Sequence, residues 1–456
     1  MSDVGNVHQG YLVRPPSGQT ARQPLGMATL ARAALILIPA LIMLDPILIW
    51  PLLYADPGGS TDVLAGAGRG FSASLLRMVW FPPIFLGTAV LFLLATRSLA
   101  PLARGPLLWW VFFFAWCMLS VVWALETGIS ASRLMLALIM MGSLVLAFAA
   151  SNNRRTILVL VFWVFVAGVL ANTAAVLTRP PGPIGHEGIF DHKNMLGAFA
   201  AAATLLACLM FTVAGRLTKV AAAVSIALCL VVLSASESKA STGFLPLAFG
   251  FGIVAALLAR YGRINPAVSA VLAIAATGVL IASAEAIFAV NPRYLAEIAT
   301  GDATFTGRTF LWEFAWEYVR ERPLLGYGFR SFWDIGPETP SLREGFGFIA
   351  TTFHGHNGYL DLLLSVGLIG LVLFLPILWV GLSAAGRIAR ARFWEGSMLI
   401  AIMMFAMLHN FMETSFFFGP HTILIFNIVW LYAVFDDVNA GASLTDPVST
   451  AAQIRR

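Results

Sequence analysis

His354, His356 and Asn357 stand directly before a long run of leucine, valine, isoleucine and glycine. An unperturbed histidine has a pKa of about 6.5, so one at a water boundary is a candidate general base near neutral pH. Earlier in the chain, Arg308 lies at the start of the segment TGRTFLWEFAWEYVRERP. A guanidinium presents a planar fork of donors that suits phosphate. Together these residue types predict that the protein binds a phosphate-linked substrate and moves a proton beside it.

The unusual polar groups fall in five segments: GHEGIFDHKNMLG (185–197), SASESKAST (234–242), TGRT (306–309), HGHNGYLD (354–361) and NFMETS (410–415). If the fold brings these segments together, several cations surround one cavity that suits a pyrophosphate. Helix starts add N–H groups and a favourable dipole end for such an anion. The predicted catalytic residues are His356 and Arg308, and the predicted pyrophosphate-binding residues are Lys239, Lys193 and Arg308. The residues predicted to support them are His192, Asn194, Asn357 and Glu413.

Each of these residues also has an explanation without catalysis. Lys193 and Lys239 could be interfacial anchors whose charged ends reach the water. Arg308 could pair with Glu313 on its own helix, and His192 could donate a hydrogen bond at a helix entry. The pair His354 and His356 could suggest a metal, but no cysteine or carboxylate cluster accompanies it in the sequence, so no metal is expected. The catalytic prediction therefore depends on the joint occurrence of these groups on one side.

The composition shows what must position these groups. Of the 456 residues, 59% are hydrophobic and only 11% are charged, with a mean hydropathy of +0.84. A soluble domain has about 25% charged residues, so this is predicted to be an all-α polytopic membrane protein. The three cysteines lie inside apolar runs, which argues against disulfides, a cysteine metal site or a thiol nucleophile. The net charge of +5 requires no nucleic-acid partner, because insertion topology explains the basic residues between helices.

Twelve apolar runs are long enough to be candidate spans, since crossing a bilayer core takes roughly 20 helical residues. They lie near 31–53, 75–95, 106–124, 130–150, 156–177, 192–214, 219–235, 241–259, 267–290, 356–381, 396–413 and 417–436. Arginine and lysine recur in every second connection, which predicts that both termini are cytoplasmic. The first apolar run is expected to remain as a helix, with no cleaved signal peptide.

One connection is much longer than the others. The predicted organisation is a cytoplasmic tail (1–30), spans 1–9 (31–290), a long periplasmic loop (291–355), spans 10–12 (356–436) and a second cytoplasmic tail (437–456). Loops of this length are uncommon unless they are functional. The aromatic segment TGRTFLWEFAWEYVRERP is predicted to form one interfacial helix that ends at Pro323.

Five stretches resemble the superfamily of O-antigen ligases and Wzy-type polysaccharide polymerases, and most of all its exopolysaccharide-production polymerase branch. They are GIFDHKNMLG, SESKAS, TGRTFLWEFAWEYVRERPLLGYGFRSFW, HNGYLDLLLSVGLIGL and NFMETS. They occur in family order between residue 188 and about residue 415, and the first five spans carry only a match in hydropathy.

This resemblance implies a GT-C-type protein of the bacterial inner membrane, with an active site at the periplasmic face. Its substrate would be an undecaprenyl-pyrophosphate-linked oligosaccharide, used without a cofactor or metal. Carried over by position, the ligases' pyrophosphate-binding arginines become Lys239 and Arg308, and their essential histidine becomes His356. Lys239 departs from the family, because the ligases usually have arginine there. Implied partners are the lipid bilayer, a flippase and chain-length or export proteins, but no nucleic acid.

Four functions are compatible with these features. A polymerase would join lipid-linked repeat units, whereas a ligase would move the finished glycan to an acceptor such as lipid A core. A transporter or flippase would also need many helices and a cationic cavity, although charges near mid-membrane and two related halves are more typical of transporters. A scaffold subunit of a secretion complex is the fourth possibility.

Overall fold

The computed structural model describes residues 26–54, 63–288, 307–416 and 420–444, and within them it is built almost entirely from helices. The helices are α1 Met27–Leu44, α2 Trp50–Tyr54, α3 Val63–Thr96, α4 Leu107–Ser120, α5 Thr127–Ala150, α6 Arg154–Thr178, α7 Lys193–Val213, α8 Arg216–Ser236, α9 Lys239–Tyr261, α10 Pro266–Phe288, α12 Arg308–Glu321, α13 Pro340–Glu344, α14 Phe348–Thr351, α15 Gly358–Ala391, α16 Phe393–His409 and α17 Pro420–Leu444. A π-helical turn, Asp45–Ile49, joins α1 to α2.

Each of the twelve predicted spans coincides with one of these helices or with a helix and its continuation. Nine helices in the described part of the chain are long and apolar enough to cross a membrane. Three further apolar helical segments are shorter: Leu107–Trp123, Phe393–His409 and His421–Asp436. At a rise of 1.5 Å per residue, a 17-residue helix reaches only about 25 Å. The all-helical membrane class is therefore supported, while the count of twelve spans stays a prediction.

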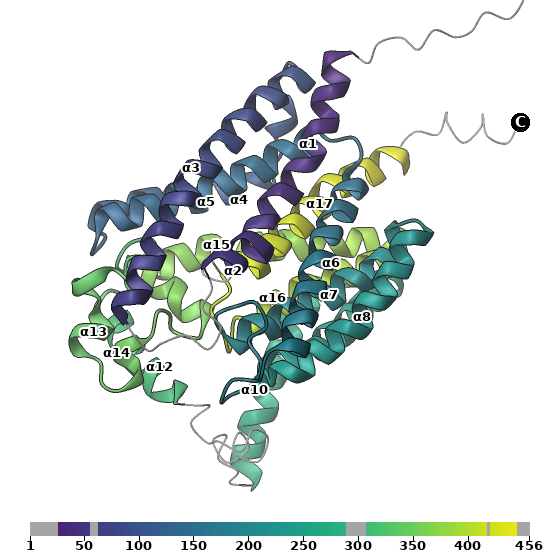
Figure 1. Cartoon of the computed structure of the whole chain (residues 1–456). Coiled ribbons are helices and arrows are strands. Elements are labelled where there is room, and N and C mark those ends of the chain that lie inside the picture. Colours follow the sequence, from purple (N-terminus) through teal and green to yellow (C-terminus); the bar gives the residue numbers. More distant parts are fainter. Residues whose placement is uncertain (1–25, 55–62, 289–306, 417–419, 445–456) are drawn as a thin grey trace, which may run out of the picture.

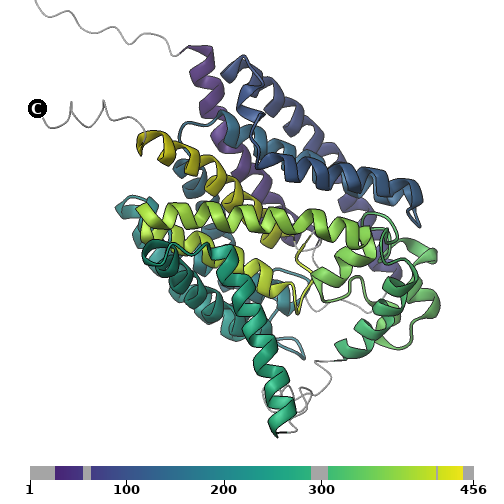
Figure 2. The same cartoon turned by 180° about the vertical axis from the view of Figure 1, so that it is seen from behind.

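The two ends of the described chain lie at the same end of the molecule. The start of α1 and the end of α17 lie toward the same end in both views, and α12, α13 and α14 lie at the opposite end (Figures 1 and 2). This is the arrangement expected if both termini are on one side of a membrane and the long loop on the other. Residues 289–306 of that loop lie outside the described residues, and α17 continues to Leu444, past the predicted end of the last span.

The predicted loop helix is present as α12, which is amphipathic and packs on α15. Its buried side chains are Leu311, Ala315 and Val319, spaced four residues apart on one face. They form a separate apolar cluster with Leu360 and Leu364 of α15. The helix that carries Arg308 at its first position is thus held against the helix that follows His356.

Helix α15 is interrupted at Gly367, where the segment after α12 is inserted. Gly367 has φ +66°, and an added Cβ would lie 2.1 Å from the carbonyl oxygen of Leu324. Tyr327 N donates to the Leu364 carbonyl (2.7 Å), and Leu368 N donates to the Pro323 carbonyl (2.8 Å). Non-helical backbone at membrane depth is tolerated where protein buries it, and these bonds satisfy the groups that the break exposes.

Replacing Gly367 by Ala should destabilise the protein, because both the positive φ and the backbone contact exclude a Cβ. Strained backbone of this kind costs about 1–3 kcal/mol, so we expect a lower Tm and less protein in the membrane. Gly250→Ala is the matched control, since a Cβ there meets nothing within 4 Å. Equal Tm values for the two variants, measured in the same detergent, would show that the break does not constrain the fold.

Candidate active site

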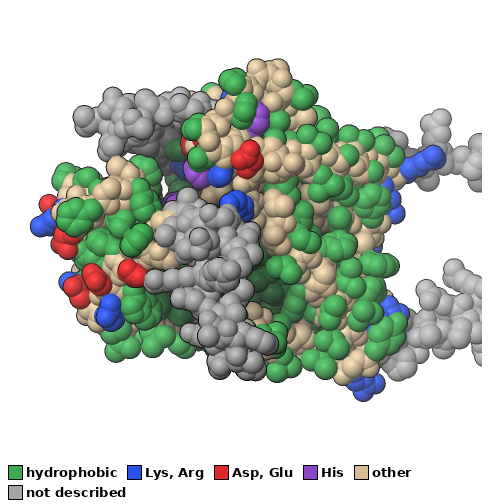
Figure 3. Space-filling model, turned by 90° about the horizontal axis from the view of Figure 1, so that it is seen from below, with side chains coloured by type: hydrophobic (Ala, Val, Ile, Leu, Met, Phe, Trp, Pro, Cys, Tyr) green, Lys and Arg blue, Asp and Glu red, His purple; other side chains and the backbone are tan. Residues whose placement is uncertain are grey.

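One buried carboxylate, that of Glu413, contacts side chains from three other predicted segments. Glu413, which is only 6% exposed, follows α16. Its Oε2 lies 3.0 Å from His356 Nδ1, and its Oε1 accepts a hydrogen bond from Asn194 Nδ2 at 2.5 Å. Arg308 completes the group through an ion pair between its guanidinium and Oε1. Figure 3 looks onto this end of the molecule, where histidine, basic and acidic side chains gather between largely hydrophobic surfaces.

Arg308 is the first residue of α12 and is mostly buried. Gly307 before it has φ +77°, a left-handed conformation that glycine adopts without strain. Besides the pair with Glu413, the guanidinium donates to the carbonyl oxygen of Met412. A guanidinium has five N–H donors, so these two contacts leave donors for an anionic ligand. The expected alternative, a pairing with Glu313, is replaced by the long-range pairing with Glu413.

His356 has a left-handed backbone, with φ +48°. Such a conformation is uncommon for a residue other than glycine, and strained residues of this kind cluster at functional sites. The next residue, Asn357, caps α15 by accepting hydrogen bonds from the backbone N–H groups of Tyr359 and Leu360, both at 3.1 Å. Its own N–H donates to Thr414 Oγ1 (3.1 Å). The cap and this contact fix the histidine against the segment that carries Glu413.

Asp361 is a positioning residue that was not among the predicted site residues. It lies in the first turn of α15, is 2% exposed, and accepts hydrogen bonds from Trp333 Nε1 (2.7 Å) and Thr414 Oγ1 (2.6 Å). Its two oxygens also accept from Gly355 N (3.1 and 3.0 Å). An ionisable side chain inside an apolar helix is a functional signal by default, and that signal was present in the sequence.

The start of α7 carries three of the predicted site residues, His192, Lys193 and Asn194. His192 caps this helix by accepting a hydrogen bond at Nδ1 from Asn194 N (3.1 Å). A helix N-terminus presents N–H groups, and the ring accepts one of them here; the predicted supporting role of His192 stays a prediction. Lys193 Nζ donates to the Ile184 carbonyl at 2.7 Å. Its role in binding pyrophosphate stays a prediction.

Lys239 is the first residue of α9 and its side chain is exposed. A buried polar chain connects this part of α9 to the Glu413 segment: Ser241 Oγ lies 3.3 Å from His409 Nε2, and His409 Nδ1 lies 2.9 Å from Ser415 Oγ. The start of α9 therefore lies at the same end of the molecule as the Glu413 group. Direct contact of Lys239 with a substrate stays a prediction.

The electrostatics of the group depend on Glu413. Burial alone would raise the pKa of Glu413, but the hydrogen bond with His356 and the charge of Arg308 outweigh it and hold that pKa well below its ordinary range. Burial lowers the pKa of His192, and Glu413 only partly opposes that effect. Burial, and then the charge of His356, also lower the pKa of His354. Glu413 is thus held ionised, and His192 and His354 are held neutral.

Three side chains of this group have the spacing of a metal site, because ligand atoms of His354, His356 and Glu413 lie within 4.8 Å of one another. The sequence could not show this grouping, since the carboxylate comes from a distant segment. Both Glu413 oxygens, however, already accept hydrogen bonds, and the adjacent Arg308 charge opposes a cation. The group has the character of a hydrogen-bonded ion pair, and we assign no metal to it.

Glu413→Gln should lower the stability of the protein in a pH-dependent way. The folded pKa of Glu413 lies below the unfolded value of about 4.3. Its ionisation therefore stabilises the folded state fully above pH 4.3, and that contribution is lost as the pH falls toward the folded pKa. We expect the Tm difference between wild type and variant to be largest near pH 7 and to shrink below about pH 4. A difference that grows with acidity would contradict the lowered pKa.

Part of this chain matches a known protein family. Residues 222–375 match the O-antigen ligase family. The match covers about a third of the chain and confirms the resemblance inferred from the sequence motifs. The matched segment contains Lys239, Arg308 and His356 and ends before Glu413. The ion pair of Arg308 therefore joins the matched segment to a residue beyond it.

Two relatives agree with the O-antigen ligase match. An exopolysaccharide production protein of Rhizobium meliloti (strain 1021), ExoQ, is 30% identical over 203 residues, which cover 43% of this chain and 46% of the relative. A protein of Rickettsia felis named "Putative polysaccharide ligase" is 33% identical over 175 residues, covering 37% of this chain and 41% of the relative. The matched region thus spans less than half the length of each relative.

Proposed function

We propose that this protein transfers glycan from an undecaprenyl-pyrophosphate donor at the periplasmic face of a bacterial inner membrane, and that it polymerises exopolysaccharide repeat units. The observation that carries the proposal is the contact of Arg308 and His356 with one buried carboxylate, Glu413. A fixed guanidinium suits a diphosphate. A histidine held beside it suits proton transfer. The O-antigen ligase match and the ExoQ relative support the same chemistry.

The hydrogen bond to Glu413 defines what His356 does in this proposal. A carboxylate held ionised only accepts hydrogen bonds, so the proton of the imidazole lies on Nδ1 and the lone pair on Nε2. Nε2 accepts the proton of the acceptor sugar hydroxyl. The resulting imidazolium is stabilised by the same carboxylate. Glu413 thus sets the tautomer and orientation of the base.

The basic side chains stabilise the leaving pyrophosphate. As the acceptor oxygen bonds to the anomeric carbon, the bond from that carbon to the pyrophosphate breaks, and its electron pair stays on the phosphate oxygen. Arg308 and Lys239, helped by Lys193, stabilise this charge, which is often the largest contribution to catalysis. Attack opposite the leaving group inverts the anomeric configuration. The proposed reaction uses no protein-bound metal, so we expect a chelator to leave it unchanged.

A second candidate is ligation of the finished glycan to an acceptor such as lipid A core. The matched family is described as O-antigen ligase, and the rickettsial relative also carries a ligase name. The HKN sequence at the start of α7, and the name of the ExoQ relative as an exopolysaccharide production protein, favour polymerisation of exopolysaccharide.

The lipid-linked intermediate that accumulates when the gene is deleted separates the two. We expect single lipid-linked repeat units, as a polymerase requires. Accumulation of long lipid-linked chains would instead indicate a ligase. An unchanged pool of lipid-linked glycan would contradict both.

A further inference from the structure

A pocket of about 580 Å³ lies at the opposite end of the two helices that border the candidate active site. Helix α7 begins near the Glu413 group and α16 ends near it, whereas the pocket lies near the end of α7 and the start of α16. The glycan chemistry proposed above makes no use of this pocket. By the predicted topology it faces the inner leaflet.

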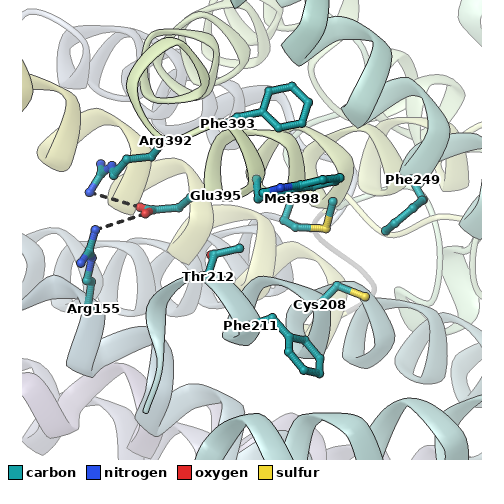
Figure 4. A pocket seen from close by; sticks show the side chains of 10 residues that line it. Arg155, Cys208, Phe211, Thr212, Phe249, Arg392, Phe393, Glu395 and Met398 are labelled. Atoms are coloured by element: carbon teal, nitrogen blue, oxygen red, sulfur yellow. Dashed lines mark hydrogen bonds and ion pairs between the residues drawn. The ribbon is translucent and has the colours of Figure 1, made fainter. Parts of the chain in front are cut away.

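The charged and the apolar residues that line the pocket lie at different depths along the helices. Its charged side chains, Arg155, Arg392 and Glu395, stand at the first residues of α6 and α16 or directly before them. Phe249 lies near the middle of α9, about 18 Å along the axis from the Tyr261 end at 1.5 Å per residue. Figure 4 shows the charged group at one side of the pocket and Phe249, Phe211 and Cys208 at the other.

Ion pairs and a hydrogen bond fix the charged rim in place, and further arginines lie near it. Glu395, 3% exposed, lies 3.2 Å from Arg155 and 3.4 Å from Arg392, and it accepts a hydrogen bond from Tyr432 (2.6 Å). Asp436 also pairs with Arg392. Two further arginines lie over the ring of Phe435, beside Asp436: Arg104 and Arg154. Of these four arginines, Arg155 and Arg392 line the pocket.

The apolar part is open toward its surroundings. Trp394 is 59% exposed, Phe211 43% and Phe249 36%. In a membrane helix bundle, such side chains face lipid tails. Arg155 is 46% exposed and a guanidinium has five N–H donors, so its ion pair with Glu395 leaves donors for a further hydrogen-bond acceptor.

We propose that this pocket binds an anionic phospholipid of the inner leaflet, with the phosphate at Arg155 and Arg392 and an acyl chain along Phe211 and Phe249. A basic rim at the interface above an apolar groove matches a lipid in both charge and depth. Basic pockets between membrane helices bind anionic headgroups by the same principle. The site lies apart from the Glu413 group and stands independently of the proposed glycan transfer.

Native mass spectrometry of the purified full chain, titrated with dioleoyl phosphatidylglycerol or dioleoyl phosphatidylcholine, tests this proposal. We expect wild type to retain phosphatidylglycerol preferentially. Arg155→Gln should weaken that binding about tenfold, since a charge-assisted hydrogen bond is lost. Arg216→Gln is the matched control, because Arg216 is an exposed arginine at the same end of the molecule, on α8, and does not line the pocket.

A second variant tests the proposal independently, in case Arg155→Gln does not fold. Cys208→Trp fills the apolar part while leaving every rim charge in place, and it should also abolish the preference for phosphatidylglycerol. Equal retention of the two lipids by wild type would overturn the proposal. So would wild-type binding by a folded Cys208→Trp protein, or identical binding by the Arg155 and Arg216 variants.

Discussion

Arg308→Lys should reduce polymer formation by about 10²–10³-fold, the typical cost of removing one donor that stabilises developing charge. Lysine keeps a positive charge beside Glu413 but cannot donate as a fork to Glu413, the Met412 carbonyl and a phosphate together. Arg308→Ala should abolish activity, but it also removes the guanidinium partner of a buried carboxylate, at a cost of up to about 3–5 kcal/mol of stability. The lysine variant therefore separates catalysis from folding.

Polymer length in cells, with the amount of protein in the membrane measured in parallel, is the readout for Arg308. Arg320→Ala is the control, because Arg320 is an exposed arginine on the same helix, α12. It should leave polymer unchanged. Polymer of normal length from Arg308→Lys would contradict a role for the guanidinium fork.

His356→Gly should lower glycan transfer by about 10²–10⁴-fold, the usual contribution of a positioned acid or base. Glycine accepts the backbone conformation of this position, φ +48°, without strain. The variant therefore removes the imidazole while sparing the local backbone. His356→Gln tests the same point differently, since it can still donate to Glu413 but cannot accept a proton at neutral pH.

The control for His356 is His186→Gln, a histidine in the segment before α7 whose backbone N–H donates to Ala235. Substitution leaves that backbone bond in place, so full activity is expected. If His356→Gln were as active as this control, His356 would be a structural hydrogen-bond donor rather than the base.

The sequence predicted local features of this protein well. Hydropathy located the apolar helices, because crossing a membrane requires long apolar runs. The helix that starts at Arg308 and stops before Pro323 followed from its pattern and from proline's effect on a helix. Arg308, His356 and Glu413 were grouped on one side because insertion topology constrains which connections share a face.

Features that depend on long-range packing were not predictable. Gly367 reads as an ordinary glycine in an apolar run, and only the contact with Leu324 explains its left-handed conformation. The hydrogen bonds of Asp361 to Trp333 and Thr414 join three distant segments. Arg308 had an acidic neighbour on its own helix, yet its partner is Glu413, over a hundred residues away. Spacing along the chain carries no information about such pairs.

Turnover by purified protein in detergent tests the central claim most directly. With lipid-linked oligosaccharide as the substrate and no sealed membrane present, we expect the glycan to lengthen. That lengthening should be lost in Arg308→Lys and His356→Gly. Glycan that moves only across sealed vesicles and never lengthens in detergent would show a transporter and contradict the account.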